Sequence, residues 1–179
     1  MQFQFVPSHG ERLACAVNLP ETTDHAWPTV IVVHGFTGHR LGKSYHLVEF
    51  ARCLAQQGIA CVRFDQRGSG ESTGDFRNIT LRTMVEDVQA IRQWTHEQPW
   101  CDTARIGMVG ISLGGLASVG HEAQSPTQAM ALWAPVYDLH ETFHATARSG
   151  LGAMMEHQGW APYRGLPIGK TFVEHLQAV

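Results

Sequence analysis

Between residues 29 and 136, short apolar runs alternate with segments of helical period, and this alternation constrains the fold more than any other feature. Residues 29–33 (Thr-Val-Ile-Val-Val) form a continuous β-branched run, typical of a strand buried on both faces of a parallel sheet. The other runs predicted as strands lie at 3–6, 13–19, 59–65, 105–111 and 129–136. Strands that alternate with helices imply right-handed crossovers, so the sequence predicts an α/β fold with a mostly parallel sheet flanked by helices.

Three helices are predicted between these strands. Apolar residues at helical spacing mark residues 47–54, where Ser44 is a candidate N-cap. A second apolar stripe runs over 81–94 after Thr80, whose hydroxyl can cap the first turn. A helix of small residues is expected over 113–123.

The pattern changes after residue 136. Glycines then interrupt the chain repeatedly, and no further strand-helix unit is evident. We therefore predict a core over 1–136 and a cap-like segment over 137–179. Four apolar residues of this segment are expected either to line a pocket or to pack the cap onto the sheet: Met154, Met155, Trp160 and Tyr163.

Composition excludes several classes of protein. With 179 residues, 44% of them hydrophobic and 16% charged, the chain is long and apolar enough to form one globular core. The net charge of −3 and the lack of a Lys/Arg run argue against a nucleic-acid partner. No apolar run approaches the ~20 residues of a membrane span, and the N-terminus does not resemble a signal peptide. Four scattered cysteines are typical of reduced thiols, so we expect a cytoplasmic protein without a membrane partner.

The strongest chemical signal is Gly110-Ile111-Ser112-Leu113-Gly114-Gly115, which fits G-x-S-x-G. It lies between a predicted buried strand and a predicted helix, as this motif requires. A serine there occupies a strained turn, and its flanking glycines must lack side chains for the turn to close. The motif predicts Ser112 as a catalytic nucleophile.

A second motif, His34-Gly35-Phe36-Thr37-Gly38, follows the first buried strand. Acyl transfer needs two N–H donors aimed at one developing oxyanion. One donor can be the N–H of Leu113, the residue after the serine, and the other the N–H of Phe36.

Together with Asp65-Gln66-Arg67-Gly68-Ser69-Gly70-Glu71-Ser72, these motifs occur in the order and spacing of the α/β-hydrolase family. Within that family the chain most resembles small bacterial carboxylesterases of the cinnamoyl or feruloyl esterase type. The resemblance implies that Ser112 is the nucleophile and that Phe36 and Leu113 supply the oxyanion N–H groups. It assigns the 65–72 loop a structural role.

A serine nucleophile also needs a general base and an acid, which in this fold follow the serine in the order acid, then His. The family's acid and His lie on two later strand-helix units, so we expect this chain to stop before them. Asp138 is an alternative acid, and the histidines after Ser112 lie outside the expected context: His121, His140, His144, His157 and His175. Three interpretations account for the missing acid and His, in order of preference: a fragment of a longer enzyme, a truncated product completed by a separate chain, and a degenerate hydrolase.

Two competing motifs point to other classes. His140-Glu141-Thr142-Phe143-His144 fits H-E-x-x-H, a zinc-binding pattern, but no third ligand is evident. Residues 68–74 hint at a dinucleotide fingerprint, but the third glycine falls one residue too late. We therefore expect neither a cofactor nor a metal.

The sequence thus predicts a serine hydrolase that cleaves carboxylic esters through an acyl-enzyme on Ser112. The alternative is a non-catalytic scaffold that keeps the fold without the chemistry. The expected partner is a small-molecule ester. Because a sheet without later strands exposes an edge, a homo-oligomer or a complementing C-terminal segment is also expected.

Overall fold

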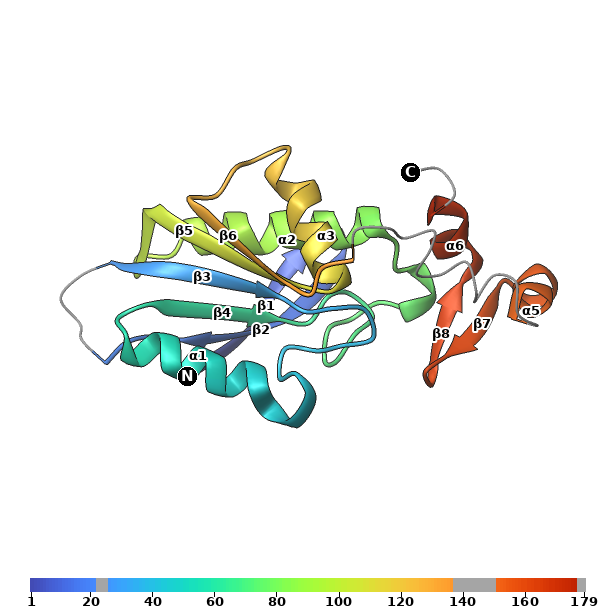
Figure 1. Ribbon diagram of the computed structural model, residues 1–179, viewed down its shortest axis with the longest axis horizontal. Coiled ribbons are helices and arrows are strands. Elements are labelled where there is room, and N and C mark those ends of the chain that lie inside the picture. Colours follow the sequence, from blue (N-terminus) through green and yellow to red (C-terminus); the bar gives the residue numbers. More distant parts are fainter. Residues whose placement is uncertain (22–25, 137–150, 177–179) are drawn as a thin grey trace.

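The computed structural model describes residues 1–21, 26–136 and 151–176, and their main feature is a six-stranded mixed sheet (Figure 1). Its order is β1-β2-β4-β3-β5-β6. The β1-β2 and β2-β4 pairs are antiparallel, whereas β3-β4, β3-β5 and β5-β6 are parallel. The strands are β1 (Gln2–Ser8), β2 (Glu11–Asn18), β3 (Trp27–Val33), β4 (Ala60–Phe64), β5 (Cys101–Ile111) and β6 (Ala129–Trp133).

Helices cover both faces of this sheet. Helix α1 (His46–Gln56) lies on one face, and α2 (Leu81–His96) and α3 (Leu113–Glu122) lie on the other (Figure 1). The predicted α/β fold, a mostly parallel sheet flanked by helices, is confirmed.

The two predicted helix caps differ in outcome. The Thr80 hydroxyl accepts a hydrogen bond from the Thr83 N–H, 3.1 Å away, and the Thr83 hydroxyl accepts one from the Thr80 N–H. This reciprocal capping box confirms Thr80 as the N-cap of α2. The expectation for Ser44 was wrong, because Ser44 lies inside a 3-10 helix, Lys43–Tyr45, with a φ of 52°. Helix α1 begins at His46 without a side-chain cap.

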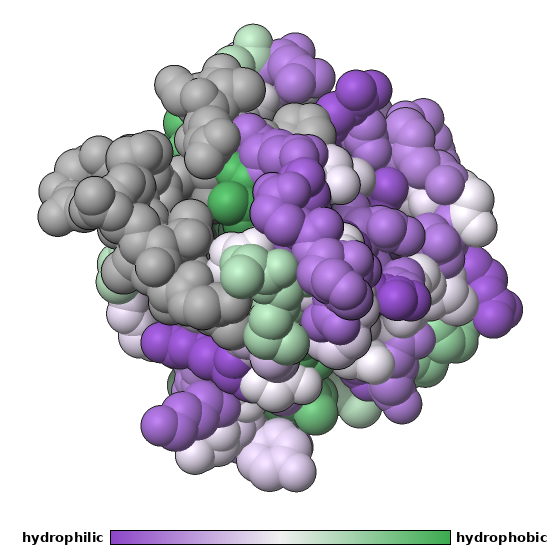
Figure 2. Space-filling model, turned by 90° about the vertical axis from the view of Figure 1, so that its right-hand side faces the viewer, coloured by the Kyte–Doolittle hydropathy of each residue, from purple (hydrophilic) through white to green (hydrophobic). Residues whose placement is uncertain are grey.

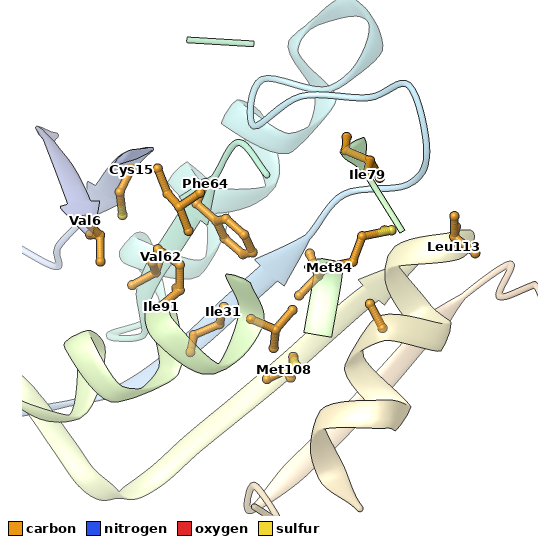
Figure 3. Packing of buried hydrophobic residues seen from close by; sticks show 14 of the residues in the cluster. Val6, Cys15, Ile31, Val62, Phe64, Ile79, Met84, Ile91, Met108 and Leu113 are labelled. Atoms are coloured by element: carbon orange, nitrogen blue, oxygen red, sulfur yellow. The ribbon is translucent and has the colours of Figure 1, made fainter. Parts of the chain in front are cut away.

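Strand β3 supplies apolar side chains to two separate cores. Ile31 and Val33 belong to the larger cluster, part of which is shown in Figure 3. Val32 belongs to the smaller cluster against α1. Successive side chains of a strand point to opposite faces, so a continuous β-branched run serves a sheet covered on both sides.

Strand β6 departs from its prediction. It ends at Trp133 rather than at residue 136, because Ala134 has a φ of 45° and Pro135 has no N–H for the ladder. Although the run is apolar, most of its residues are exposed, including Leu132 and Trp133. Within the described residues it is an edge strand of the sheet.

Residues 151–176 form a small unit of their own at the end toward which the parallel strands run (Figure 1). It contains a hairpin that is not part of the main sheet. Its elements are α5 (Leu151–Gln158), β7 (Trp160–Tyr163), β8 (Leu166–Gly169) and α6 (Lys170–Leu176). Figure 2 views the molecule from this end and shows mainly hydrophilic side chains on the described surface.

The apolar side chains of this 151–176 unit mostly pack inward. Met155 and Phe172 are buried in the larger core cluster, and Tyr163 packs against it, whereas Met154 is exposed. Met155 and Tyr163 therefore pack the unit onto the rest of the molecule. The division into a core over 1–136 and a cap over 137–179 stays a prediction.

The four cysteines are free thiols. In the described part of the chain, no helix combines the length and apolar character that crossing a bilayer requires.

Candidate active site

Ser112 lies at the sharp turn between β5 and α3, in a backbone conformation that non-glycine residues rarely adopt. Its φ is 52° and its ψ is −123°. The Ser112 N–H donates to the carbonyl of Trp133 over 3.0 Å. Its own carbonyl accepts from the N–H groups of Gly115, at 3.0 Å, and Val136, at 3.2 Å. Hydrogen bonds to neighbouring elements therefore hold this strained residue in place.

The glycines on either side of Ser112 leave no room for side chains. A β carbon at Gly110 would lie 2.5 Å from the Gly115 Cα and 2.7 Å from the Ser118 Oγ. A β carbon at Gly114 would lie 2.5 Å from the Val33 carbonyl oxygen and would also overlap the carbonyl of His34. Contacts this short are not tolerated, so glycine at both positions lets α3 start against β3.

The loop after β3 lies directly against this turn. A β carbon at Gly35 would lie 3.0 Å from the Ser112 Cβ and 3.6 Å from its Oγ. The loop then turns back, since the Gly38 N–H donates to the Gly35 carbonyl over 3.0 Å and Thr37 has a φ of 62°. The two glycine motifs, 77 positions apart when counted from Gly35 to Ser112, thus meet at the carboxyl ends of β3 and β5.

His34 is buried and hydrogen-bonded through both ring nitrogens. Its Nδ1 lies 2.8 Å from the Gly35 carbonyl oxygen, and the Gln66 N–H donates to its Nε2 over 3.1 Å. A nitrogen that accepts carries no proton, so the ring is the neutral tautomer with its proton on Nδ1. Burial lowers the pKa of His34, although the Gly35 carbonyl favours the charged form.

These bonds also orient the peptide unit between Gly35 and Phe36. Its carbonyl oxygen accepts from both the His34 Nδ1–H and the Gly38 N–H. A trans peptide is planar, so the N–H of Phe36 points away from that oxygen. Sequence reasoning missed this role of His34, although its place next to Gly35 in the motif was a signal.

The structure brings the three predicted site residues into one region. Leu113 is the first residue of α3, directly after Ser112, and it is buried. Phe36 follows Gly35, whose Cα is packed against Ser112. The side chain of Phe36 packs against the larger core cluster. Their catalytic roles stay predictions.

The 65–72 loop is held by a buried carboxylate. Asp65 accepts from the N–H of Arg40 over 2.5 Å and from the N–H of Glu71 over 2.9 Å, and it pairs with the Arg40 guanidinium. The Ser72 hydroxyl donates to the Asp65 carbonyl over 2.6 Å. All these partners belong to loop structure, which agrees with the structural role that the resemblance implies.

The histidines after Ser112 are distributed over several elements. His121 is buried in α3, and burial lowers its pKa, while His157 lies in the last turn of α5 and His175 lies in α6. Among the described residues, no three His, Cys, Asp or Glu side chains are grouped to hold a metal. Asp138 and the H-E-x-x-H motif at 140–144 lie outside the described residues.

Sequence comparison relates the chain to hydrolases. Residues 9–164 match the family described as X-Pro dipeptidyl-peptidase (S15 family). The chain is 36% identical over 106 residues to an uncharacterized 31.7 kDa protein of the traX-finO intergenic region of Escherichia coli, covering 59% of this chain and 35% of that protein. It is 33% identical over 112 residues to the esterase YjfP of Escherichia coli, covering 58% of this chain and 43% of the esterase.

Comparison of structures gives the same fold. The structure of Est1E from Butyrivibrio proteoclasticus with ferulic acid bound superimposes on this chain with a TM-score of 0.81 and 24% sequence identity. The superposition covers 98% of this chain and 71% of that chain. The chain spans less than half the length of the two Escherichia coli relatives. The family match shows that the chain belongs to the X-Pro dipeptidyl-peptidase (S15) family, and the superposition shows that it has the fold of Est1E.

Proposed function

We propose that this protein is a serine hydrolase that cleaves carboxylic esters and that Ser112 is its nucleophile. The observation that carries the proposal is the strained backbone of Ser112, with a φ of 52°, at a strand-to-helix turn packed against Gly35. Strain of this kind gathers at functional sites, and this turn is the context in which G-x-S-x-G presents a serine for attack.

In the proposed reaction, the Ser112 Oγ attacks the ester carbonyl while a general base takes its proton. The carbonyl oxygen becomes an oxyanion, which accepts hydrogen bonds from the N–H groups of Phe36 and Leu113. The alcohol then leaves with a proton, and water hydrolyses the acyl-enzyme to release the acid and restore the serine. The step uses neither a metal nor a cofactor.

The general base and its acid partner are not assigned to described residues. His34 is unsuited, because both of its ring nitrogens are already hydrogen-bonded. We propose that the base and acid come from residues outside the described ranges, from a second copy of the chain or from a complementing C-terminal segment.

A small-molecule ester is the proposed substrate. The related YjfP is named an esterase, and the structural relative Est1E has ferulic acid bound. The expected site of action is the cytoplasm, which maintains the reduced state of cysteine thiols.

One observation favours a second candidate, a hydrolase scaffold without catalysis. Within the described residues, the Ser112 Oγ makes no hydrogen bond to a histidine. A serine without a base is a weak nucleophile, so such a chain would keep the fold without the reaction.

Hydrolysis of p-nitrophenyl butyrate by the full chain, beside Ser112→Ala and Ser125→Ala, separates the two candidates. Ser125 lies just beyond the end of α3 and serves as the control. The hydrolase predicts activity that Ser112→Ala abolishes and Ser125→Ala retains. Covalent labelling by a fluorophosphonate probe should follow the same pattern. A folded wild-type chain that neither turns over nor labels would support the scaffold.

A further inference from the structure

Among the described residues, three other aromatic rings lie around the half-buried side chain of Phe36. Its ring stacks on that of Phe172, with centroids 4.6 Å apart and an interplanar angle of 11°. The rings of Phe76 and Tyr163 lie 5.3 Å and 6.1 Å from it, both tilted by about 40°. These four residues form what we term the aromatic cluster. Offset and tilted pairs at such distances are attractive beyond the area they bury.

Two members of the aromatic cluster come from the 151–176 unit, which is firmly docked. Its strand β8 lies against the 3-10 helix Phe76–Asn78, so that a β carbon at Gly169 would overlap the Arg77 carbonyl and lie 2.9 Å from its carbon. Phe172 and Ile168 are each only 1% exposed. The unit is therefore packed against this 3-10 helix, and its Tyr163 and Phe172 rings also contact Phe36 in the loop after β3.

Residue 36 is thus held in two independent ways. Its peptide plane is set by the hydrogen bonds to the Gly35 carbonyl, and its side chain is set by the aromatic cluster. Together these restrict both the direction and the position of its N–H. A donor aimed at an oxyanion contributes fully only when it is already in place before the reaction.

We propose that Phe172 and Tyr163 are positioning residues, through which the 151–176 unit holds the Phe36 N–H in its place beside Ser112. The effect on catalysis rests on the proposed function, whereas the effect on the position of the 34–38 loop does not. The unit then acts on the reaction through the aromatic cluster, in addition to any contact that it makes with substrate.

The test compares variants of the full chain that keep or remove ring contacts. Phe172→Leu keeps an apolar side chain but removes the stacked ring, and Tyr163→Leu removes the second ring. Tyr163→Phe retains a ring and is the conservative control. Met155→Ala is the matched packing control, because Met155 is buried in the same unit but is not aromatic.

Two readouts are measured on each variant. Hydrogen exchange of the peptide that spans residues 34–38 reports on the loop, with residues 60–64 of β4 as the internal reference. The rate of Ser112 labelling by a fluorophosphonate probe reports on the site. Phe172→Leu and Tyr163→Leu should speed exchange at 34–38 and slow labelling, each by up to about tenfold. Tyr163→Phe should leave both near the wild-type values, and Met155→Ala, which removes packing but no ring, should change both less than Phe172→Leu does.

Where turnover is measurable, kcat should fall with KM nearly unchanged, because the N–H acts in the transition state. Unchanged exchange at 34–38 in both leucine variants would overturn the positioning role, even if Ser112 labels normally. A wild-type chain that does not label would contradict the proposed function, and exchange would still decide the positioning role. Equal effects of Met155→Ala and Phe172→Leu would reduce that role to general packing.

Discussion

The N–H of Gln66 donates to the Nε2 of His34 over 3.1 Å, which joins the loop after β4 to the loop after β3. This bond selects the tautomer of His34 that can donate from Nδ1 to the Gly35 carbonyl. A backbone group of one loop thereby determines the direction of a peptide unit in another. His34 thus has a structural role, since its ring donates a hydrogen bond to the carbonyl of Gly35, the next residue in the chain.

Replacing His34 by leucine should therefore reduce both stability and reactivity. The substitution keeps apolar volume but leaves the buried Gln66 N–H without its acceptor and the Gly35 carbonyl with one donor fewer. We expect a loss of about 2 kcal/mol in the free energy of unfolding, measured by urea denaturation, and slower labelling of Ser112. Unchanged stability and labelling in His34→Leu would contradict the role assigned to these bonds.

Stability should fall as the pH falls below about 6.5. Burial lowers the pKa values of His34 and His121 from their ordinary value of 6.5. The unfolded chain then takes up protons at a pH where the folded chain does not, so the contribution of both groups is complete above pH 6.5 and declines below it. Each histidine can lower the free energy of unfolding by up to about 1.4 kcal/mol per pH unit in that range.

Urea midpoints between pH 8 and pH 5 measure this decline, and His121→Leu tests its source. The His121 Nε2 is buried without a hydrogen-bond partner among the described residues, so leucine sacrifices no observed bond at that atom. The variant should show a flatter pH dependence than the wild type. A profile as steep as that of the wild type would exclude His121 as a contributor.

The tight turn at Ser112 predicts a strong contrast between two glycines of α3. In Gly114→Ala, the new methyl group would overlap backbone oxygens of Val33 and His34, which cannot move without distorting β3. We expect a loss of about 3 kcal/mol by urea denaturation. In Gly120→Ala, the methyl group would meet only the Val85 Cγ2, at 2.9 Å, and alanine favours the helix. This control should stay within about 1 kcal/mol of the wild type, and similar losses in both variants would contradict the packing argument.

The exposed edge strand β6 predicts self-association. Within the described residues, the outer side of β6 pairs with no other strand and Leu132 and Trp133 are exposed, so this edge can pair with a second chain. Light scattering should give a mass that rises with concentration above the 19.8 kDa of one chain. Ala131→Lys, which places a charge on β6, should lower that mass, whereas Gln128→Lys just before the strand should not. A concentration-independent monomer with a cooperative melt would refute this expectation.

Local signals in the sequence determined the fold class and the place of the serine. The β-branched run at 29–33 required cover on both faces, and the capping pattern at Thr80 set the start of α2. The glycines around Ser112 specified a turn that closes only when the residues flanking the serine lack side chains. These features depend on neighbours in the chain, so they can be predicted without knowing the tertiary structure.

Tertiary structure decided what depends on residues far apart in the chain. The tautomer of His34 follows from Gln66, 32 positions away, and the setting of Phe36 follows from Phe172. Within the described residues, the exposure of β6 follows from its place at the edge of the sheet rather than from its apolar sequence. Hydrogen bonds and ring contacts of this kind form only when separate elements pack together. They therefore cannot be predicted from apolar periodicity or motif spacing.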